Sequence, residues 1–251
     1  MLLDLQAFER HITAVCSTVT AKRYVVSVRS FLSWLAQDVR RPLQSAPRGV
    51  LSDYATVLLN RGHLPGTIQA HMAGINRYIR WLDTQGVSSP EFFKAELPRR
   101  KRRVKDVLSP EHLRLYTQLA NELDEPLRSA IMLFPCTGLR SNEMATLKLN
   151  SAKRVPFQMA GGQTRDTTTL KVRGKGGDER VVPVLEEGVT VLHTYFDRWR
   201  KYHPDTQWLF PGRYAGHIST RALREAVQKI RKPLRMTFTP HTMRRTYLTS
   251  L

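Results

Sequence analysis

A short, densely charged segment near the middle of this sequence divides it into two stretches. Residues 96–106 read ELPRRKRRVKD and hold six lysines or arginines against two acidic residues. Charges at this density stay in water, and Pro98 interrupts regular hydrogen bonding, so the segment is typical of an extended linker. We therefore expect two domains, residues 1–95 and 107–251, joined by a basic linker at 96–106.

The stretch before this linker reads as helical throughout. Apolar residues recur at helical spacing, as Ile68, Met72 and Ile75 do within PGTIQAHMAGINRYIRWLDTQG. The pattern predicts helices at 5–16, 20–37, 52–62 and 65–86. Ser52 is the expected N-cap of the third helix. Four helices with short polar connections indicate a small bundle.

The stretch after the linker mixes two periodicities. The runs at 167–173 and 179–184 are rich in β-branched residues, and GKGGD joins them, which predicts an antiparallel hairpin. Ser109 and Pro110 are typical of a helix start. Further helical patterns lie at 110–123, 125–136, 186–202 and 218–230, after Ser141 and after Pro240. We expect a mainly α chain with a small antiparallel β-hairpin or sheet, of the α+β class.

The net charge indicates the kind of partner. The chain has 40 lysines and arginines against 21 acidic residues, a formal charge of +19. A compact chain this basic repels itself, which favours a polyanionic partner. An anionic membrane is the other candidate, but we find no run of about 18 apolar residues and no cleavable signal. We therefore expect a cytoplasmic protein with a polyanionic partner.

Cysteines and histidines give no sign of a metal. Cys16 and Cys136 lie far apart, so we expect two free thiols in a reducing compartment. The eight histidines form neither an H-E-x-x-H nor a C-x-x-C arrangement. The sequence predicts no metal site and no cofactor.

Several cations of the second domain lie beside turns or helix starts. In CTGLRSNEMATLKL (136–149), Gly138 ends one helix and Ser141 can cap the next, with Glu143 close enough to orient Arg140. His241 and Arg244 share one face of the helix after Pro240. Lys175 lies at the tip of the expected hairpin.

Each of these residues taken alone also fits a solvated surface side chain. Together, two arginines, a lysine and a histidine suit attack at a phosphodiester. The planar guanidinium group of arginine can donate two parallel hydrogen bonds to phosphate oxygens, and lysine and histidine can transfer protons.

The order of these motifs resembles that of the tyrosine recombinase, or phage integrase, family. TGLRSNEMATLKL resembles the first-arginine motif of the family, VRGKGGDERVVPV its hairpin-lysine motif, and PHTMRRTYLTSL its H-x-x-R motif. WLFPG at 208–212 is similar to a segment that precedes the last helices. The resemblance covers residues 107–251, the expected catalytic domain. Residues 1–95 match the helical, SAM-like core-binding domain of the family only in size and position.

The resemblance implies a role for each candidate. Arg140 and Arg244 would bind the non-bridging oxygens of the scissile phosphate, with Glu143 supporting Arg140. His241 would act as general base or hydrogen-bond donor, and Lys175 would protonate the departing 5′-oxygen. The family nucleophile is a tyrosine that forms a 3′-phosphotyrosyl link, so strands rejoin without ATP or metal.

The nucleophile is where the pattern departs from the family. In the family, about 25–35 residues follow the H-x-x-R helix before that tyrosine, and we find no such segment before Leu251. Tyr247 is interpreted as a core residue rather than a substitute nucleophile. We expect that this chain does not cleave alone, whether through truncation, natural shortening, or a tyrosine supplied by a neighbouring chain.

The expected partner is double-stranded DNA with paired half-sites, bound with self-association into the tetramer of the family. Phosphate contacts are expected from the linker, at Arg99, Arg100, Lys101, Arg102, Arg103 and Lys105. Base reading is expected from Lys22, Arg23, Arg77 or Arg80 in the first domain. Alternatives are a non-catalytic DNA-binding protein on the same scaffold, an RNA-binding protein and a type IB topoisomerase.

Overall fold

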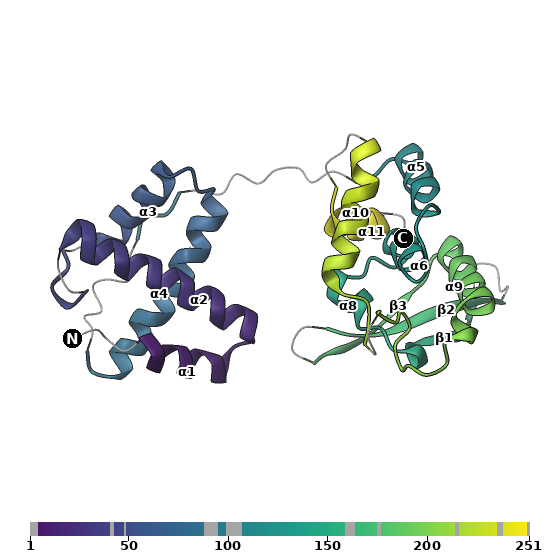
Figure 1. Cartoon of the computed structure of the whole chain (residues 1–251), viewed down its shortest axis with the longest axis horizontal. Helices are drawn as coiled ribbons and strands as arrows, with labels where there is room; N and C mark the ends of the chain where they lie inside the picture. The colour runs from purple at the N-terminus through teal and green to yellow at the C-terminus, as the bar shows by residue number, and fades with distance from the viewer. Residues whose placement is uncertain are drawn as a thin grey trace. The chain divides into compact units, whose positions relative to one another are not determined.

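The computed structural model divides the chain into two compact units, residues 1–103 and 104–251 (Figure 1). The structure describes residues 5–40, 43–47, 49–87, 95–98, 107–158, 164–174, 177–213, 216–234 and 238–249. The described residues are mainly helical, with one small antiparallel sheet, which confirms the α+β class that the periodicities predicted. The linker residues 99–106 and Lys175 lie outside the described residues.

The first unit is a helical bundle built on one aromatic core. Its helices are α1 (Leu5–Val15), α2 (Thr18–Trp34), α3 (Val50–Asn60) and α4 (Pro65–Thr84), with a π-helical turn at Leu35–Val39 and a 3-10 turn at Leu43–Ser45. α2 packs across α4, and α1 packs on α2 (Figure 1). Phe8 meets Tyr78 edge-on at 5.0 Å between ring centroids. Buried aromatic pairs of this kind hold the helices together.

The start of α3 differs from the prediction. The helix begins at Val50 after Gly49, whose φ of 86° is left-handed, so Ser52 is not the N-cap. A glycine adopts that conformation at little cost and can turn the chain into the helix three residues earlier than an N-cap at Ser52 would. The Ser52 hydroxyl instead accepts a hydrogen bond from the backbone N–H of Glu96, at 3.0 Å.

The second unit surrounds a larger core with seven α-helices among its described residues. They are α5 (Pro110–Ala120), α6 (Leu127–Met132), α7 (Phe134–Thr137), α8 (Ser141–Ala145), α9 (Glu186–Arg198), α10 (Thr220–Leu234) and α11 (Pro240–Thr249); 3-10 turns lie at Leu149–Ser151 and Arg200–Tyr202. Ser109 caps α5 as predicted, its hydroxyl accepting from the N–H of His112. The single helix predicted at 125–136 is divided into α6 and α7. Pro135 lies in the first turn of α7, where its missing N–H is tolerated.

The sheet has three antiparallel strands in the order β1-β2-β3. They are β1 (Ala152–Gln158), β2 (Thr164–Arg173) and β3 (Glu179–Pro183). The β2–β3 hairpin was predicted, with Leu170 opposite Val182 and both buried in the core. β1 was missed because it reads AKRVPFQ, with two cations and a proline, a composition that is tolerated on an edge strand.

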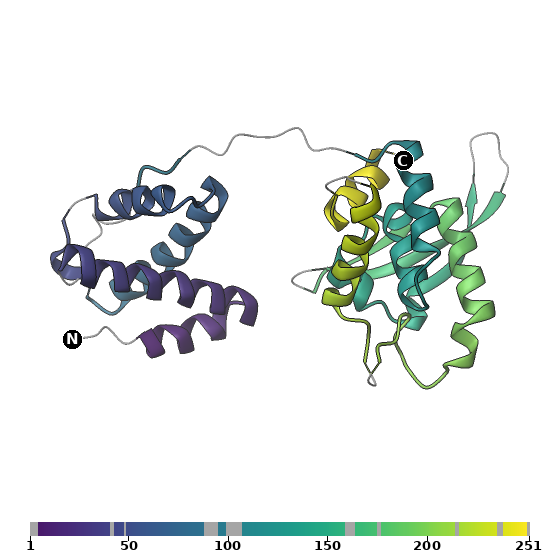
Figure 2. The same ribbon diagram turned by 45° about the horizontal axis from the view of Figure 1, so that its top comes forward.

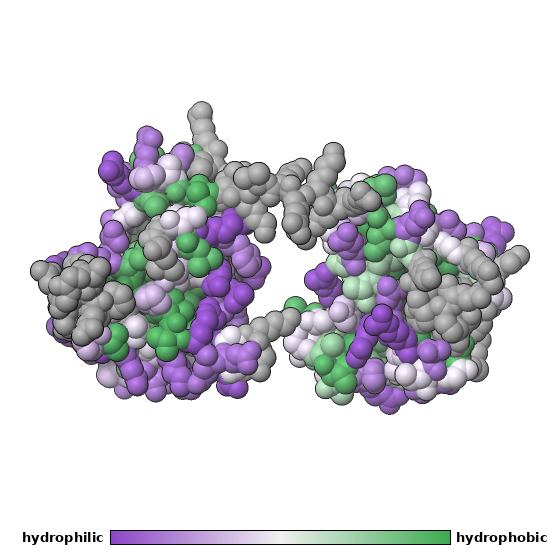
Figure 3. Space-filling view, turned by 180° about the vertical axis from the view of Figure 1, so that it is seen from behind, coloured by the Kyte–Doolittle hydropathy of each residue, from purple (hydrophilic) through white to green (hydrophobic). Residues whose placement is uncertain are grey.

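Helices cover the sheet and leave polar residues outside. In Figure 2 the helices of the second unit stand in front of the strands, and contacts join α9 to β2 and α10 to α5, α6 and α8. On the face drawn in Figure 3, hydrophilic residues surround smaller hydrophobic patches on both units. Among the helices that the structure describes, none is long and apolar enough to cross a membrane.

Candidate functional site

The candidate site is centred on the turn between α7 and α8. Gly138 ends α7 with a left-handed φ of 58°, and Arg140 follows in an extended conformation as the residue before α8. Ser141 is therefore the first residue of the helix and not its N-cap, which corrects the prediction. Because Arg140 is held in the cap position, its side chain leaves the helix start at a fixed place. Thr137 reinforces the end of α7 by donating to the carbonyl of Leu133 at 2.6 Å.

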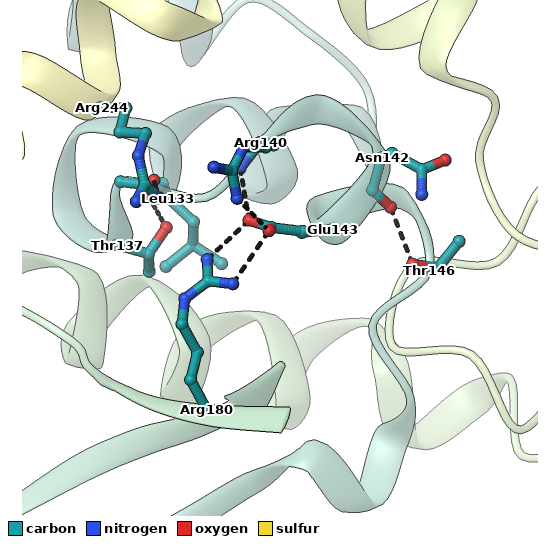
Figure 4. Close-up of polar contacts among 9 residues, drawn as sticks. Leu133, Thr137, Arg140, Asn142, Glu143, Thr146, Arg180 and Arg244 are labelled. Carbon is teal, nitrogen blue, oxygen red and sulfur yellow. Dashed lines mark hydrogen bonds and ion pairs between the residues drawn. The ribbon is translucent and has the colours of Figure 1, made fainter. Parts of the chain in front are cut away.

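Glu143 joins two arginines from different parts of the unit. Its Oε1 accepts from Nη1 of Arg140 at 2.7 Å and from Nη1 of Arg180 at 2.9 Å. Its Oε2 accepts from the backbone N–H of Arg140 at 2.9 Å and from Nη2 of Arg180 at 2.7 Å. These four contacts use the roughly four acceptor positions of a carboxylate. Figure 4 shows the two guanidinium groups on either side of the carboxylate.

The electrostatics of Glu143 follow from these contacts. Its side chain is only 4% exposed, and burial alone would raise the pKa of the carboxyl group. The hydrogen bonds from Arg180 and then from Arg140 outweigh burial and lower the pKa to about 2. Glu143 is thus a carboxylate at neutral pH, and Arg180 has a raised pKa because of its bonds to Glu143.

Arg244 comes to the same place from α11, which packs against α7. Its Nη1 donates to the carbonyl of Gly138 at 2.7 Å, and Figure 4 draws it beside Arg140. Burial lowers the pKa of Arg244, and the positive charges of Arg140 and Arg180 lower it further. Three guanidinium groups against one carboxylate leave two positive charges in excess. Unbalanced charge at a partly exposed site favours an anionic ligand.

Of the other two predicted catalytic residues, His241 lies among the described residues and Lys175 does not. His241 is exposed in the first turn of α11, one turn before Arg244, and α11 begins at Pro240 as expected. Lys175 lies outside the described residues. The hairpin around it closes through a hydrogen bond from the N–H of Gly174 to the carbonyl of Asp178, at 2.7 Å.

Tyr247 is packed into the unit. Its side chain is 4% exposed, and its hydroxyl donates to the carbonyl of Pro183 at 2.8 Å. A Cβ on Gly138 would lie 2.5 Å from Cδ1 of Tyr247, so the ring fits against the bare glycine. Burial raises the pKa of the phenol, which further disfavours the phenolate. These contacts support a packing role.

Sequence reasoning missed Arg180. It pairs with Val172 in the β2–β3 register and shares a strand face with Val182, and both valines are buried. An arginine at a core-facing position of a strand needs a buried partner. That alternation was readable in ERVVPV and could have indicated an acidic partner elsewhere.

Two of the residues proposed to read bases in the first unit lie in one groove. Lys22 and Arg23 from α2 line a hollow of about 480 Å³ together with His71 from α4. Arg77 and Arg80 are exposed on α4. Their contact with DNA bases stays a prediction.

The potential metal ligands among the described residues do not cluster. Among them, no group of three or more histidine, cysteine, aspartate or glutamate side chains could hold a metal ion. Within the described segments both cysteines are free, Cys136 buried and Cys16 partly exposed.

Comparison with known proteins identifies the family. Residues 106–251, more than half of the chain, match the model of the phage integrase family. The chain belongs to this family. It is 25% identical over 247 residues to the tyrosine recombinase XerC of Oceanobacillus iheyensis, covering 94% of this chain and 77% of that protein. It is 29% identical over 231 residues to the XerC of Leptospira interrogans, covering 90% of this chain and 65% of that protein.

Solved structures of other recombinases share the fold. A lambda integrase dimer bound to a COC′ core site superimposes with a TM-score of 0.72 at 15% identity, over 98% of this chain and 87% of that one. XerH recombinase bound to a palindromic difH substrate gives a TM-score of 0.68 at 17% identity, over 92% and 68% of the two chains. At these identities the likeness establishes the architecture of this family member and not its substrate.

Proposed function

We propose that this chain binds double-stranded DNA and acts in site-specific recombination of the tyrosine recombinase type. The observation that carries the proposal is the cluster of Arg140, Arg180 and Arg244 around the single carboxylate of Glu143. Its two excess positive charges match the two negative charges that a phosphodiester carries once a fifth, deprotonated oxygen has added to phosphorus. Preorganised cations of this kind can accelerate phosphoryl transfer about 10³-fold or more.

Each candidate has a role in that chemistry. Arg140 and Arg244 bind the two non-bridging oxygens of the scissile phosphate. His241, exposed one turn before Arg244, accepts or shares the proton of the attacking tyrosine. Lys175 donates a proton to the departing oxygen, as its place in the hairpin motif implies.

The covalent steps balance without a cofactor. The tyrosine oxygen attacks phosphorus, the bond from phosphorus to the 5′-oxygen breaks, and the 5′-oxygen leaves as a hydroxyl. The product is a 3′-phosphotyrosyl link. Attack by the 5′-hydroxyl of another strand then reverses the step, so the energy of the phosphodiester is retained.

The packing of Tyr247 excludes it from the role of nucleophile in this proposal. Its hydroxyl is bonded to a strand carbonyl and its ring lies against Gly138. Residues 1–251 are therefore expected to bind DNA without cleaving it through Tyr247. The attacking tyrosine is another residue of the same protein or of a neighbouring copy.

The names of related proteins support the rest of the proposal. XerC proteins are tyrosine recombinases, and one structural neighbour is a lambda integrase tetramer bound to a Holliday junction. We propose that this chain binds paired half-sites, self-associates on them and works in the cytoplasm with the nucleoid. The basic linker, Arg99 to Lys105, would contact backbone phosphates.

The test is selection of bound duplexes from a random library, followed by a search for a denaturant-resistant protein–DNA adduct. We expect selected sites with two inverted half-sites. An adduct that forms with the original chain and disappears with Tyr247→Phe would contradict our assignment of Tyr247. Equal binding to RNA, with no half-sites, would contradict the proposed function.

The alternative is a non-catalytic DNA-binding protein on the same scaffold. Both readings predict half-site binding, but they differ once a tyrosine-bearing family member is mixed in. Recombination requires that Arg140→Ala abolish strand exchange at sites this chain occupies. A regulator would leave exchange insensitive to that substitution.

A further inference from the structure

Arg180 reaches the candidate site from the sheet, whereas Arg140 and Glu143 belong to the start of α8. Its side chain is 33% exposed and extends from β3, on the face that carries Val182. Both terminal nitrogens of its guanidinium are bonded to Glu143, at 2.9 and 2.7 Å. This is the two-pronged geometry in which arginine binds a carboxylate most firmly.

The two arginines use Glu143 in different ways. Arg140 gives the carboxylate one side-chain nitrogen and its backbone N–H, and its side chain is 51% exposed. The rest of its fork is therefore open to a ligand. Arg180 already donates hydrogen bonds from both Nη1 and Nη2 to Glu143, so its guanidinium group is poorly placed to bind a phosphate itself.

Removing Arg180 would change what Glu143 does to Arg140. The carboxylate would lose two of its four hydrogen bonds and the charge that balances it. The lone pairs that Arg180 had occupied would then attract further N–H groups of the Arg140 guanidinium. An Arg140 side chain fully paired with Glu143 would bind an anion weakly. Glu143 can hold Arg140 without neutralising it only while a second cation shares the carboxylate.

We infer that Arg180 is a positioning residue: its fork fixes Glu143 so that Arg140 keeps an open, charged edge for a phosphate. The inference rests on the proposed function, because it names what prepares Arg140 for the scissile phosphate. It also explains why one carboxylate lies between two arginines. Arg180 acts through Glu143 and not by touching the substrate.

The experiment measures binding of inorganic phosphate to the full chain through the Nε–H signals of arginine side chains in NMR spectra. In the original chain, phosphate shifts the signals of Arg140 and Arg244 with one shared Kd. We expect Arg180→Gln to weaken that Kd roughly tenfold, by analogy with the lower end of the loss seen when a residue that orients a metal ligand is removed. Arg180→Lys restores part of the affinity, because it returns the charge without the fork.

The matched control is Arg221→Gln. Arg221 also pairs with a carboxylate, that of Glu225 at 2.7 Å, but it does so on the exposed surface of α10. This variant loses the same charge and leaves Glu143 untouched, so its Kd for phosphate should change less than twofold. Equal weakening of the Kd in Arg180→Gln and Arg221→Gln would overturn the inference, because the loss of net charge alone would then explain the effect.

A double-mutant cycle separates positioning from direct contact or general damage. In a Glu143→Gln background, Arg180→Gln should weaken the Kd much less than in the original background, because only the through-space charge of Arg180 then still acts on the phosphate site. A further loss as large as in the original background would overturn the inference. If phosphate fails to shift Arg140 and Arg244 in the original chain, the proposed function fails instead, so the two failures are distinguishable.

Discussion

Arg244 on α11 donates to the carbonyl of Gly138, 106 residues earlier in the chain, at 2.7 Å. That contact brings the H-x-x-R helix to the turn from which Arg140 extends. The ring of Tyr247 packs against the same glycine. Gly138 therefore contacts both Arg244 and Tyr247 of α11, the last described helix, and lies two residues before Arg140.

Gly138→Ala should destabilise the second unit by about 2–4 kcal/mol. The new Cβ would lie 2.5 Å from the ring of Tyr247, in addition to the strain of a left-handed φ. Gly177→Ala is the control, because it has a positive φ of 98° but ordinary contact distances, and should cost about 1 kcal/mol. Urea unfolding measures both, and equal costs would mean that the ring does not depend on the glycine.

Tyr247→Phe should cost about 1 kcal/mol, the net value of one hydrogen bond to the carbonyl of Pro183. The ring and its contact with Gly138 are retained. We therefore expect unchanged phosphate affinity at Arg140 and Arg244, measured by the same NMR titration. A large loss of affinity would show that the hydroxyl does more than hold the helix.

The stability of the second unit should fall in acid because of Glu143. Its pKa is lowered to about 2 from an ordinary value of 4.5. A depressed folded-state pKa stabilises the fold above the unfolded value, and that contribution is lost as the pH falls from about 4.5 towards 2. The full contribution is on the order of 2 kcal/mol, allowing for the exposure of both arginines.

The measurement is urea unfolding of the original chain and of Glu143→Gln at pH 5.5 and pH 3. The variant lacks the titrating carboxyl, so the stability difference between the two proteins should shrink by about 1–2 kcal/mol at the lower pH. A difference that is the same at both pH values would contradict the assignment.

Replacing Arg99, Arg100, Arg102 and Arg103 by alanine should weaken binding to all DNA sequences and reduce its salt dependence. Each lost phosphate contact lowers the slope of log K against log salt by about 0.9, so four contacts account for about 4. Lysine at the same four positions keeps the charge and should keep the slope. If the alanine variant retains the original slope, the linker lies away from the DNA.

Sequence patterns predicted the local features of this chain well. The helices, the hairpin and the Arg140–Glu143 pair all depend on residues close in sequence, where spacing fixes geometry. β1 was missed because an edge strand can carry Lys153, Arg154 and Pro156 without loss. The caps at Ser52 and Ser141 were wrong because glycine or backbone geometry began each helix earlier.

Local sequence patterns could not predict the contacts of the site that join residues far apart in the sequence. Arg180 lies 37 residues from Glu143, and Arg244 lies 106 residues from Gly138. No periodicity links such pairs, although motif order placed Arg140 and Arg244 in one family site. Only the fold shows that a strand arginine shares the carboxylate.

In the proposed complex, Arg140 and Arg244 bind one phosphate. A crystal structure of the chain with a selected duplex tests it most directly. We expect nitrogen–oxygen distances of about 3 Å from both guanidinium groups to the two non-bridging oxygens of a single phosphate. Arginines bound to different phosphates, or DNA seated on another face of the second unit, would contradict it.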